Sequence, residues 1–112
     1  MRHVSRPSTD VFGEAWERLF SPAIAHRGLW TPGGAPENSL AAFQAACERG
    51  YGVELDVRLS SDGEAMVFHD EKLARMTGAE GRIGERTRAE LEDLRLAGTD
   101  EKIPTLLETL AL

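Results

Sequence analysis

Two carboxylate side chains stand two positions apart in a stretch of alternating polar and aliphatic residues. Glu54 and Asp56 are the acidic members of the segment 52–59. On an extended strand, residues two apart project from the same face and lie about 6–7 Å from each other. The two carboxylates would repel each other, and a hard divalent cation such as Mg²⁺ or Ca²⁺ would relieve that repulsion. The alternative is a solvated polar strand face on which Arg58 pairs with Asp56.

Two histidines each follow a short apolar run. His26 comes after residues 23–25, and His69 comes after residues 65–68. If these runs are strands of a parallel α/β fold, both imidazoles lie at carboxyl ends of strands, where such folds build their sites. Imidazole exchanges protons near neutral pH, so the pair could serve as general acid and general base. The alternative is two unrelated histidines in loops.

Three further side chains are close to His26 in the sequence. Arg27 can offer its forked guanidinium to a phosphate, and the adjacent Gly28 lets a ligand approach the backbone. A surface salt bridge is the alternative for Arg27. Glu37 and Asn38 precede a helix, so Asn38 can cap it while Glu37 faces the site.

Strands and helices alternate along the chain, which favours a parallel α/β arrangement. The expected elements are a helix at 8–20, a strand at 23–25, a helix from Asn38 or Ser39 to Gly50, strands at 52–59 and 65–68, a polar loop at 71–84, a helix at 87–96 and a last helix beginning at Leu106. The turn signal at Asp62 and Gly63 could instead join the strands on either side of it as a hairpin.

Composition narrows the class of protein. The chain has 112 residues, 41% hydrophobic and 29% charged, which is the size and balance of one small globular domain. The net charge of −6 argues against a nucleic-acid partner. No apolar run approaches the roughly 18 residues of a membrane span, and the N-terminus lacks a signal peptide, so we expect a cytoplasmic protein. Cys47 is expected in the core of its helix.

Four sequence strings occur in an order and spacing typical of one protein family. They are AHRG at 25–28, APENSLAAFQAACERG at 35–50, VELDVRLSSDGEAMVFHDEKLARMTG at 53–78 and IPTL at 103–106. With them, the chain resembles the amino-terminal part of the glycerophosphodiester phosphodiesterases. The resemblance implies a (β/α)₈ TIM barrel that uses a divalent metal to hydrolyse glycerophosphodiesters to glycerol 3-phosphate and an alcohol.

The resemblance also implies roles for individual residues. The acid–base pair would be His26 and His69, the phosphate-binding residue Arg27, the metal ligands Glu54 and Asp56, and the site edge Glu37 and Asn38. The substrate would be a small-molecule glycerophosphodiester, and the cation Mg²⁺ or Ca²⁺. Trp30, in the loop after His26, could line a pocket and alter specificity for the alcohol side of the substrate.

The chain departs from the family in its length. A barrel of this kind needs about 250 residues, and the family's third metal carboxylate lies on a strand beyond residue 112. Residues 1–22 are expected to form a helical segment before the barrel. Residues 23–112 would form the truncated N-terminal part of the phosphodiesterase domain, with roughly three strands and their helices. The isolated chain is expected to fold poorly and to be inactive, because a strand edge and an apolar face stay uncovered.

Two alternative functions remain open from the sequence. One is a phospholipase D-like relative that acts on lysophospholipid or sphingolipid head groups with the same histidines and carboxylates. The other is an inactive fragment with no catalytic role.

Overall fold

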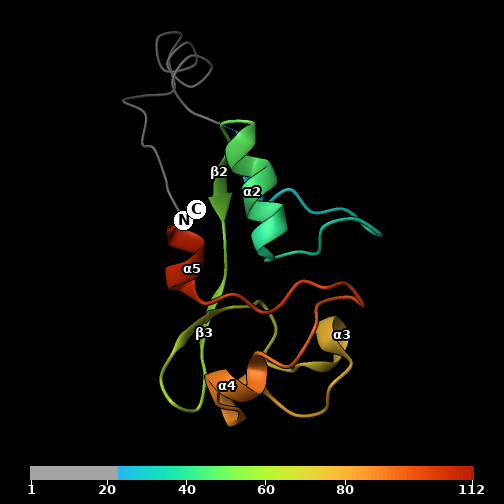
Figure 1. Cartoon of the computed structure of the whole chain (residues 1–112), viewed down its shortest axis with the longest axis vertical. Coiled ribbons are helices and arrows are strands. Elements are labelled where there is room, and N and C mark those ends of the chain that lie inside the picture. The colour runs from blue at the N-terminus through green and yellow to red at the C-terminus, as the bar shows by residue number, and fades with distance from the viewer. Residues whose placement is uncertain (1–22) are drawn as a thin grey trace, which may run out of the picture.

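The computed structural model describes residues 23–112 (Figure 1), so the helix predicted at 8–20 and the segment 1–22 lie outside the described residues. The elements are β1 (Ile24–His26), α2 (Leu40–Glu48), β2 (Gly52–Glu54), β3 (Val57–Leu59), β4 (Ala65–Val67), α3 (Ala74–Thr77), a 3₁₀ helix (Ile83–Glu85), α4 (Arg88–Leu91) and α5 (Leu106–Leu110). None of the helices in this part of the chain is long and apolar enough to cross a membrane.

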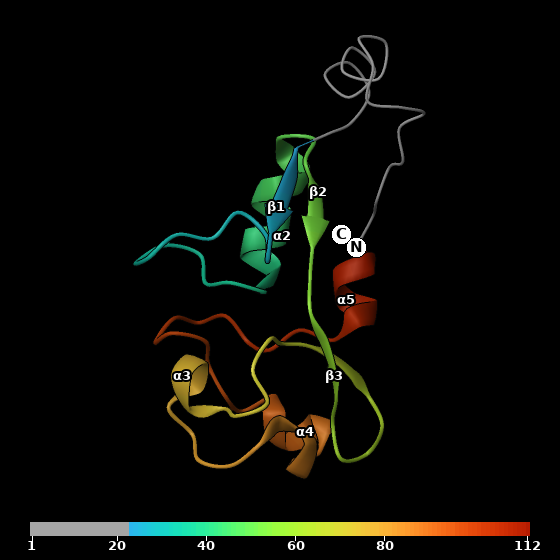
Figure 2. The ribbon, with the colours of Figure 1, turned by 180° about the vertical axis from the view of Figure 1, so that it is seen from behind.

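The first part of the fold is a parallel strand pair joined by a helix, which we call the strand–helix–strand unit (residues 24–54). β1 pairs in parallel with β2, and His26 lies opposite Glu54 in the register. Figure 2 shows the two strands side by side with α2 packed against them. The helix begins as predicted, because the Ser39 side chain accepts a hydrogen bond from the amide of Ala42. This strand–helix–strand arrangement is the repeating unit of a (β/α)₈ barrel.

The single strand predicted at 52–59 is wrong. β2 ends at Glu54, and β3 begins at Val57 with a different partner. β3 pairs antiparallel with β4, so the hairpin alternative is the correct one. The aliphatic side chains of β3, Val57 and Leu59, are exposed, so this face of the strand is not packed under helices.

An apolar core lies under the hairpin, in what we call the hairpin lobe (residues 57–104). Its buried members come from β4, the short helices and the connecting loops: Met66, Phe68, Leu73, Met76, Ile83, Leu91, Leu96 and Ile103. The segment 71–84 was expected as a loop. It contains α3, and the 3₁₀ helix starts near its end, at Ile83. The helix expected at 87–96 is shorter, and Thr87 and Glu90 form a capping box at its start. The lobe therefore owes its order to tertiary packing more than to long helices.

The buried stripe of α2 does not include Cys47, which was expected in the core. Ala42, Phe43 and Ala46 are buried, whereas Cys47 is exposed. Cys47 directly follows Ala46, so it lies about 100° further around the helix and falls off the stripe that faces the strands. The prediction that Cys47 is a core residue is therefore wrong.

Gly28 lets the chain turn sharply against α2 directly after β1. Its φ is +84°, and a Cβ atom built there would lie 2.8 Å from the Cβ of Ala42 and 2.9 Å from its carbonyl carbon. Both the left-handed backbone and the lack of space require glycine. This tight turn holds the site residues that follow β1 close to the start of α2.

We expect Gly28→Ala to lower the free energy of unfolding by about 2–4 kcal/mol, the sum of backbone strain and overpacking. Gly50→Ala is the matched control, since Gly50 has a φ of +71° and nothing within 4 Å of a built Cβ. It should cost only the backbone part, about 1–2 kcal/mol. Urea unfolding of the two variants measures the difference, and equal losses would contradict the steric argument.

Candidate active site

His26 and Glu54 meet at the ends of the parallel strands. The Nε2 atom of His26 lies 2.8 Å from Oε1 of Glu54. The backbone amide of Arg27 donates to the carbonyl of Glu54 over 2.7 Å. Because both strands run in the same direction, their carboxyl ends lie at one edge of the sheet. Two of the predicted site residues are thus in direct contact there.

Arg27, Glu37, Asn38 and Asp56 form a polar cluster next to that pair. Arg27 donates from Nη1 to Oε2 of Glu37 over 3.1 Å, and its Nε lies 3.5 Å from Oδ2 of Asp56. The side-chain amide of Asn38 donates to the same oxygen of Asp56 over 3.2 Å. Since Ser39 caps α2, the side chain of Asn38 is left to hold Asp56. The predicted edge residues therefore contact the predicted phosphate and metal residues.

Two residues of this cluster have an unusual backbone. Arg27 has a φ of +62° and Asn38 a φ of +53°, both in the left-handed region. Such conformations cost most non-glycine residues roughly 1–3 kcal/mol, and asparagine adopts them more readily than most. The backbone amide of Asn38 donates a hydrogen bond of 2.9 Å to the backbone carbonyl of Arg27, which connects the two residues directly. With this backbone, the side chains of both residues contact Asp56.

His69 reaches the site through the hairpin. β4 runs antiparallel to β3 with Val67 opposite Val57, so the chain returns past Asp56 as it leaves β4. The amide of Phe68 donates to the carbonyl of Asp56 over 2.9 Å, and Arg58 donates from Nε to the carbonyl of His69 over 2.7 Å. The prediction that His69 ends a parallel strand is wrong. The hairpin register brings it to the carboxyl end of β2 instead.

Arg75 is a site residue that sequence reasoning missed. Its guanidinium donates two hydrogen bonds of 2.9 Å to the carboxylate of Glu37, and bonds of 2.8 and 3.1 Å to that of Asp70. Asp70 in turn lies 2.8 Å from Nδ1 of His69. Arg75 lies on α3, five residues after Asp70 and 38 after Glu37. No local spacing rule signals a contact over that distance.

The two carboxylates that Arg75 binds are held in their ionised form. Hydrogen bonding from Arg75 lowers the pKa of Asp70 from 3.8 to about 2. The same arginine lowers the pKa of Glu37, although burial of this side chain, which is only 5% exposed, acts in the opposite direction. The Glu37 and Asp70 carboxylates in return raise the pKa of Arg75. Charge complementarity therefore stabilises the network at neutral pH.

Acid should weaken the folded state through Asp70. Its folded pKa of about 2 lies below the ordinary 3.8, so its stabilisation is present above pH 4 and is lost as the pH falls towards 2. We expect a contribution of at most about 2 kcal/mol. In Asp70→Asn, the free energy of unfolding should fall less steeply between pH 4 and pH 2.

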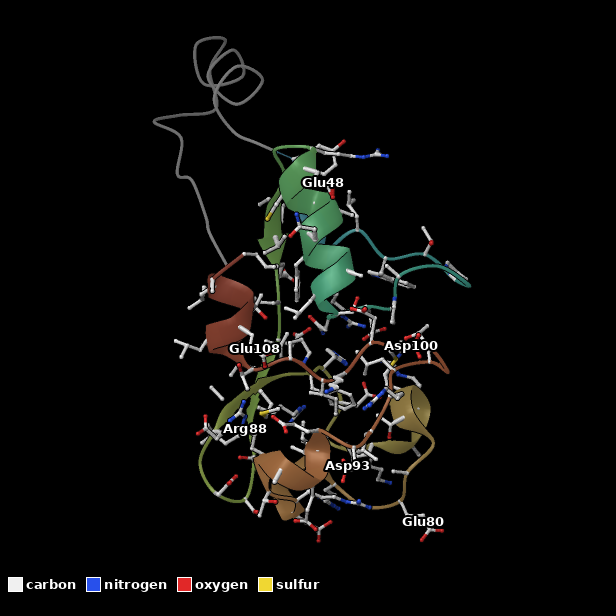
Figure 3. The ribbon with its side chains drawn as sticks, in the orientation of Figure 1. Glu48, Glu80, Arg88, Asp93, Asp100 and Glu108 are labelled. Atoms are coloured by element: carbon white, nitrogen blue, oxygen red, sulfur yellow. The ribbon has the colours of Figure 1, made fainter. Side chains whose placement is uncertain are left out.

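The control for that experiment is Asp93→Asn. Asp93 is exposed and lies towards the end of the hairpin lobe away from α2 (Figure 3). It should keep the wild-type slope of stability against pH. Urea unfolding from pH 2 to pH 6 measures all three proteins. An unchanged slope in Asp70→Asn would contradict the ion pair with Arg75.

The donor set around Asp56 suits a hard cation. Glu54 and Asp56 supply carboxylates, and Oδ1 of Asn38 is buried without a hydrogen-bond partner among the described residues. Oxygen ligands of this type are those that Mg²⁺ and Ca²⁺ take in proteins. Within residues 23–112, however, no group of three or more His, Cys, Asp or Glu side chains is close enough to hold a metal. Glu54 and Asp56 have the oxygen donors of such a site, but the described residues do not assemble three ligands.

A pocket of about 390 Å³ adjoins the cluster. Trp30, Pro32 and Met76 contribute apolar wall, and Glu37, Arg75 and Thr99 contribute polar wall. The indole of Trp30 donates to the carbonyl of His26 over 3.1 Å, which fixes this side chain beside the site. The prediction that Trp30 lines a pocket is confirmed.

Comparison with known proteins identifies the relatives of this chain. Residues 26–112 match the family model described as the glycerophosphoryl diester phosphodiesterase family. A glycerophosphodiester phosphodiesterase of Caldanaerobacter subterraneus is 43% identical over 98 residues, which are 80% of this chain and 39% of the relative. The human glycerophosphodiester phosphodiesterase 1 is 42% identical over 98 residues, which are 80% of this chain and 29% of the relative.

Solved structures give the same result. A phosphodiesterase of Oleispira antarctica, in complex with the product sn-glycerol-3-phosphate, superposes with a TM-score of 0.74 and is 40% identical. The match covers 84% of this chain and 40% of that one. A glycerophosphodiester phosphodiesterase of Thermotoga maritima has a TM-score of 0.66 and 44% identity, covering 80% and 37%. The predicted fold class, a partial (β/α)₈ TIM barrel, is confirmed. The chain spans about two fifths of the length of these solved relatives.

Proposed function

This chain belongs to the glycerophosphoryl diester phosphodiesterase family, and we propose that the protein hydrolyses glycerophosphodiesters to glycerol 3-phosphate and an alcohol. One arrangement supports the proposal above all. His26, Arg27 and Asp56 lie where the parallel strands end, and the hairpin brings the chain back past Asp56 just before His69. A relative 40% identical to this chain was solved with the product sn-glycerol-3-phosphate. In the proposed reaction, the same phosphate and glycerol groups would stay bound at the site after the alcohol has left.

The two histidines would divide the proton transfers. One would take the proton from the attacking water or substrate hydroxyl, and the other would protonate the departing alkoxide. His69 has Nδ1 engaged by Asp70, so its Nε2 is the atom left for the substrate. His26 contacts Glu54 through Nε2.

Arg27 would bind the phosphate. Its guanidinium is planar and always charged, which suits the bidentate recognition of phosphate oxygens. Glu37 holds it on one side and Asp56 on the other. A cation fixed in this way needs little reorganisation as negative charge develops on the phosphate oxygens.

Glu54 and Asp56 would be the metal ligands of this chain, with Asn38 positioning Asp56. The family generally depends on a divalent metal, and Mg²⁺ or Ca²⁺ suits the oxygen donors. Such a cation would neutralise charge on the phosphate oxygens. Further ligands would be needed to complete the site, because no group of three or more His, Cys, Asp or Glu side chains among the described residues is placed to hold a metal.

A second candidate is a phospholipase D-like activity on lysophospholipid or sphingolipid head groups. The pocket beside Trp30 favours it, since Trp30, Pro32 and Met76 offer apolar surface next to Arg75. A chain of methylene groups gains about 0.8 kcal/mol for each group that it buries. We rank this function second, because the named relatives are glycerophosphodiester phosphodiesterases. A role in glycerol and lipid metabolism and a cytoplasmic location stay predictions.

One assay separates the two functions. The full-length protein is incubated with glycerophosphocholine or with lysophosphatidylcholine, with Mg²⁺ or Ca²⁺ present, and the phosphate products are identified. We expect glycerol 3-phosphate from glycerophosphocholine and little cleavage of lysophosphatidylcholine. Release of lysophosphatidic acid as the main product would favour the second candidate. Cleavage of neither substrate would contradict both.

A further inference from the structure

Arg75 uses one guanidinium to hold two carboxylates from different parts of the fold. Glu37 lies in the segment between β1 and α2, and Asp70 follows β4 in the hairpin lobe. The nitrogens Nη1 and Nη2 reach Glu37, and Nε and Nη2 reach Asp70, all within 3.1 Å. Paired bonds of this kind fix direction as well as distance. Arg75 therefore joins the strand–helix–strand unit to the lobe at the site.

The Asp70 side of this contact determines how His69 is presented. Oδ1 of Asp70 accepts from Arg75 and lies 2.8 Å from Nδ1 of His69. A carboxylate is an acceptor, so the His69 proton lies on Nδ1 and Nε2 carries the lone pair when the ring is neutral. A fixed carboxylate behind an imidazole selects its tautomer and its orientation in other hydrolases. Here the fixing of that carboxylate depends on Arg75.

The Glu37 side of the contact determines where Arg27 lies. Oε2 of Glu37 accepts from both arginines, at 2.9 Å from Arg75 and 3.1 Å from Arg27. Glu37 is almost fully buried, so it has little freedom to move while both partners are bound. Removal of Arg75 would leave Glu37 with Arg27 alone and would free it to rotate.

We propose that Arg75 is the positioning residue of this site, fixing His69 through Asp70 and Arg27 through Glu37. This inference rests on the proposed function for its kinetic consequences. The competing explanation is an ordinary ion pair that only holds the lobe in place. Arg75 is about half exposed, and exposed ion pairs contribute roughly 0–1 kcal/mol to stability.

Kinetics of Arg75→Ala and Arg75→Lys test the proposal in the full-length protein. We expect Arg75→Ala to lower kcat by about 100-fold, with KM within about twofold, as small misplacements do. Arg75→Lys should recover only part of that loss, since an ammonium cannot bind both carboxylates in the same geometry. Added guanidinium ion should partly restore kcat in Arg75→Ala, because it can occupy the vacated position between the carboxylates.

The matched control is Arg88→Ala. Arg88, on α4, is exposed to a similar degree and pairs with Glu92, the C-cap residue of that helix, outside the site. Its kcat should be unchanged, with no response to guanidinium ion. Three results would overturn the proposal: a rise in KM at unchanged kcat in Arg75→Ala, a loss of kcat that matches a loss of folded protein, or an equal response of both variants to guanidinium ion.

A second readout does not depend on activity. The ¹⁵N chemical shifts of the His69 ring report which nitrogen holds the proton when the ring is neutral. We expect the Nδ1-protonated form in the wild type, and a mixture of both forms in Arg75→Ala and in Asp70→Asn. Unchanged shifts in Arg75→Ala would overturn the positioning role. If the wild type cleaves no glycerophosphodiester, the proposed function fails, and these shifts still decide the role of Arg75.

Discussion

Replacing His26 or His69 by alanine is expected to lower kcat for glycerophosphodiester hydrolysis by about 100- to 10,000-fold, the usual contribution of a general acid or base. The free energy of unfolding should change little. The side chains are 61% and 43% exposed, so neither fills a core position. Steady-state kinetics together with urea unfolding would separate the two effects.

A substrate with a better leaving group would distinguish the two histidines. A nitrophenolate departs without protonation, whereas a choline or glycerol alkoxide needs a proton from the general acid. The variant that lacks the acid should therefore regain most of its activity on a nitrophenyl diester. The variant that lacks the base should stay slow on both substrates. The exposed Gln44 on α2 gives the control Gln44→Ala. Turnover close to wild type in either histidine variant would rule out its proposed role.

Removal of the metal is expected to abolish activity, and Asp56→Asn is expected to raise the metal concentration required for half-maximal rate. An increase of more than about 10-fold is anticipated, since loss of even an indirect metal contact has effects of that size. Asparagine has nearly the shape of aspartate but lacks its charge, so the contact with Asn38 can be kept in part while a ligand is weakened. Titration of Mg²⁺ and of Ca²⁺ into the chelator-treated protein, following diesterase rate, measures this.

Asp62→Asn is the control for loss of one carboxylate. Asp62 lies in the turn between β3 and β4, where it accepts hydrogen bonds from the Ser60 hydroxyl and the Arg88 amide. It contacts none of the proposed site residues, so its metal requirement should equal that of the wild type. If Asp56→Asn and Asp62→Asn show the same metal dependence, Asp56 belongs to a solvated strand face and is not a ligand.

Features set by neighbouring residues were predicted correctly from the sequence. The cap of α2 at Ser39 was expected, and the capping boxes that begin at Thr87 and Thr105 satisfy backbone amides in the same local way, within three residues. Such interactions are written in a short stretch of sequence. The last helix accordingly begins at Leu106, as expected.

Features set by distant partners were not predictable. The alternation between residues 52 and 59 continues across Leu55, where the strand partner changes from β1 to β4. Hydrophobic periodicity records which face is apolar, and it does not record the partner strand. α3 has only four residues and no side-chain cap, so the sequence offers no start signal for it. Arg75 could not be identified from the sequence either, because its partner Glu37 lies 38 residues away.

The candidate site residues fall between these two cases. The chemistry of His26, Arg27, Glu54 and Asp56 is visible in their types and spacing, and the structure brings them to one edge. The left-handed backbone of Arg27 is not visible, because no residue type there announces it. Asn38 could be read as a cap, and only the structure shows Ser39 in that role.

The pairing of β3 with β4 limits how this segment can change length during evolution. Val57 lies opposite Val67 and Leu59 opposite Ala65, so His69 returns to the level of Leu55. Deleting one residue from a single strand would move His69 along the sheet by about 3.3 Å and turn it to the opposite face. Insertions and deletions compatible with activity should therefore fall in the turn at residues 60–64, or occur in matched pairs, one in each strand.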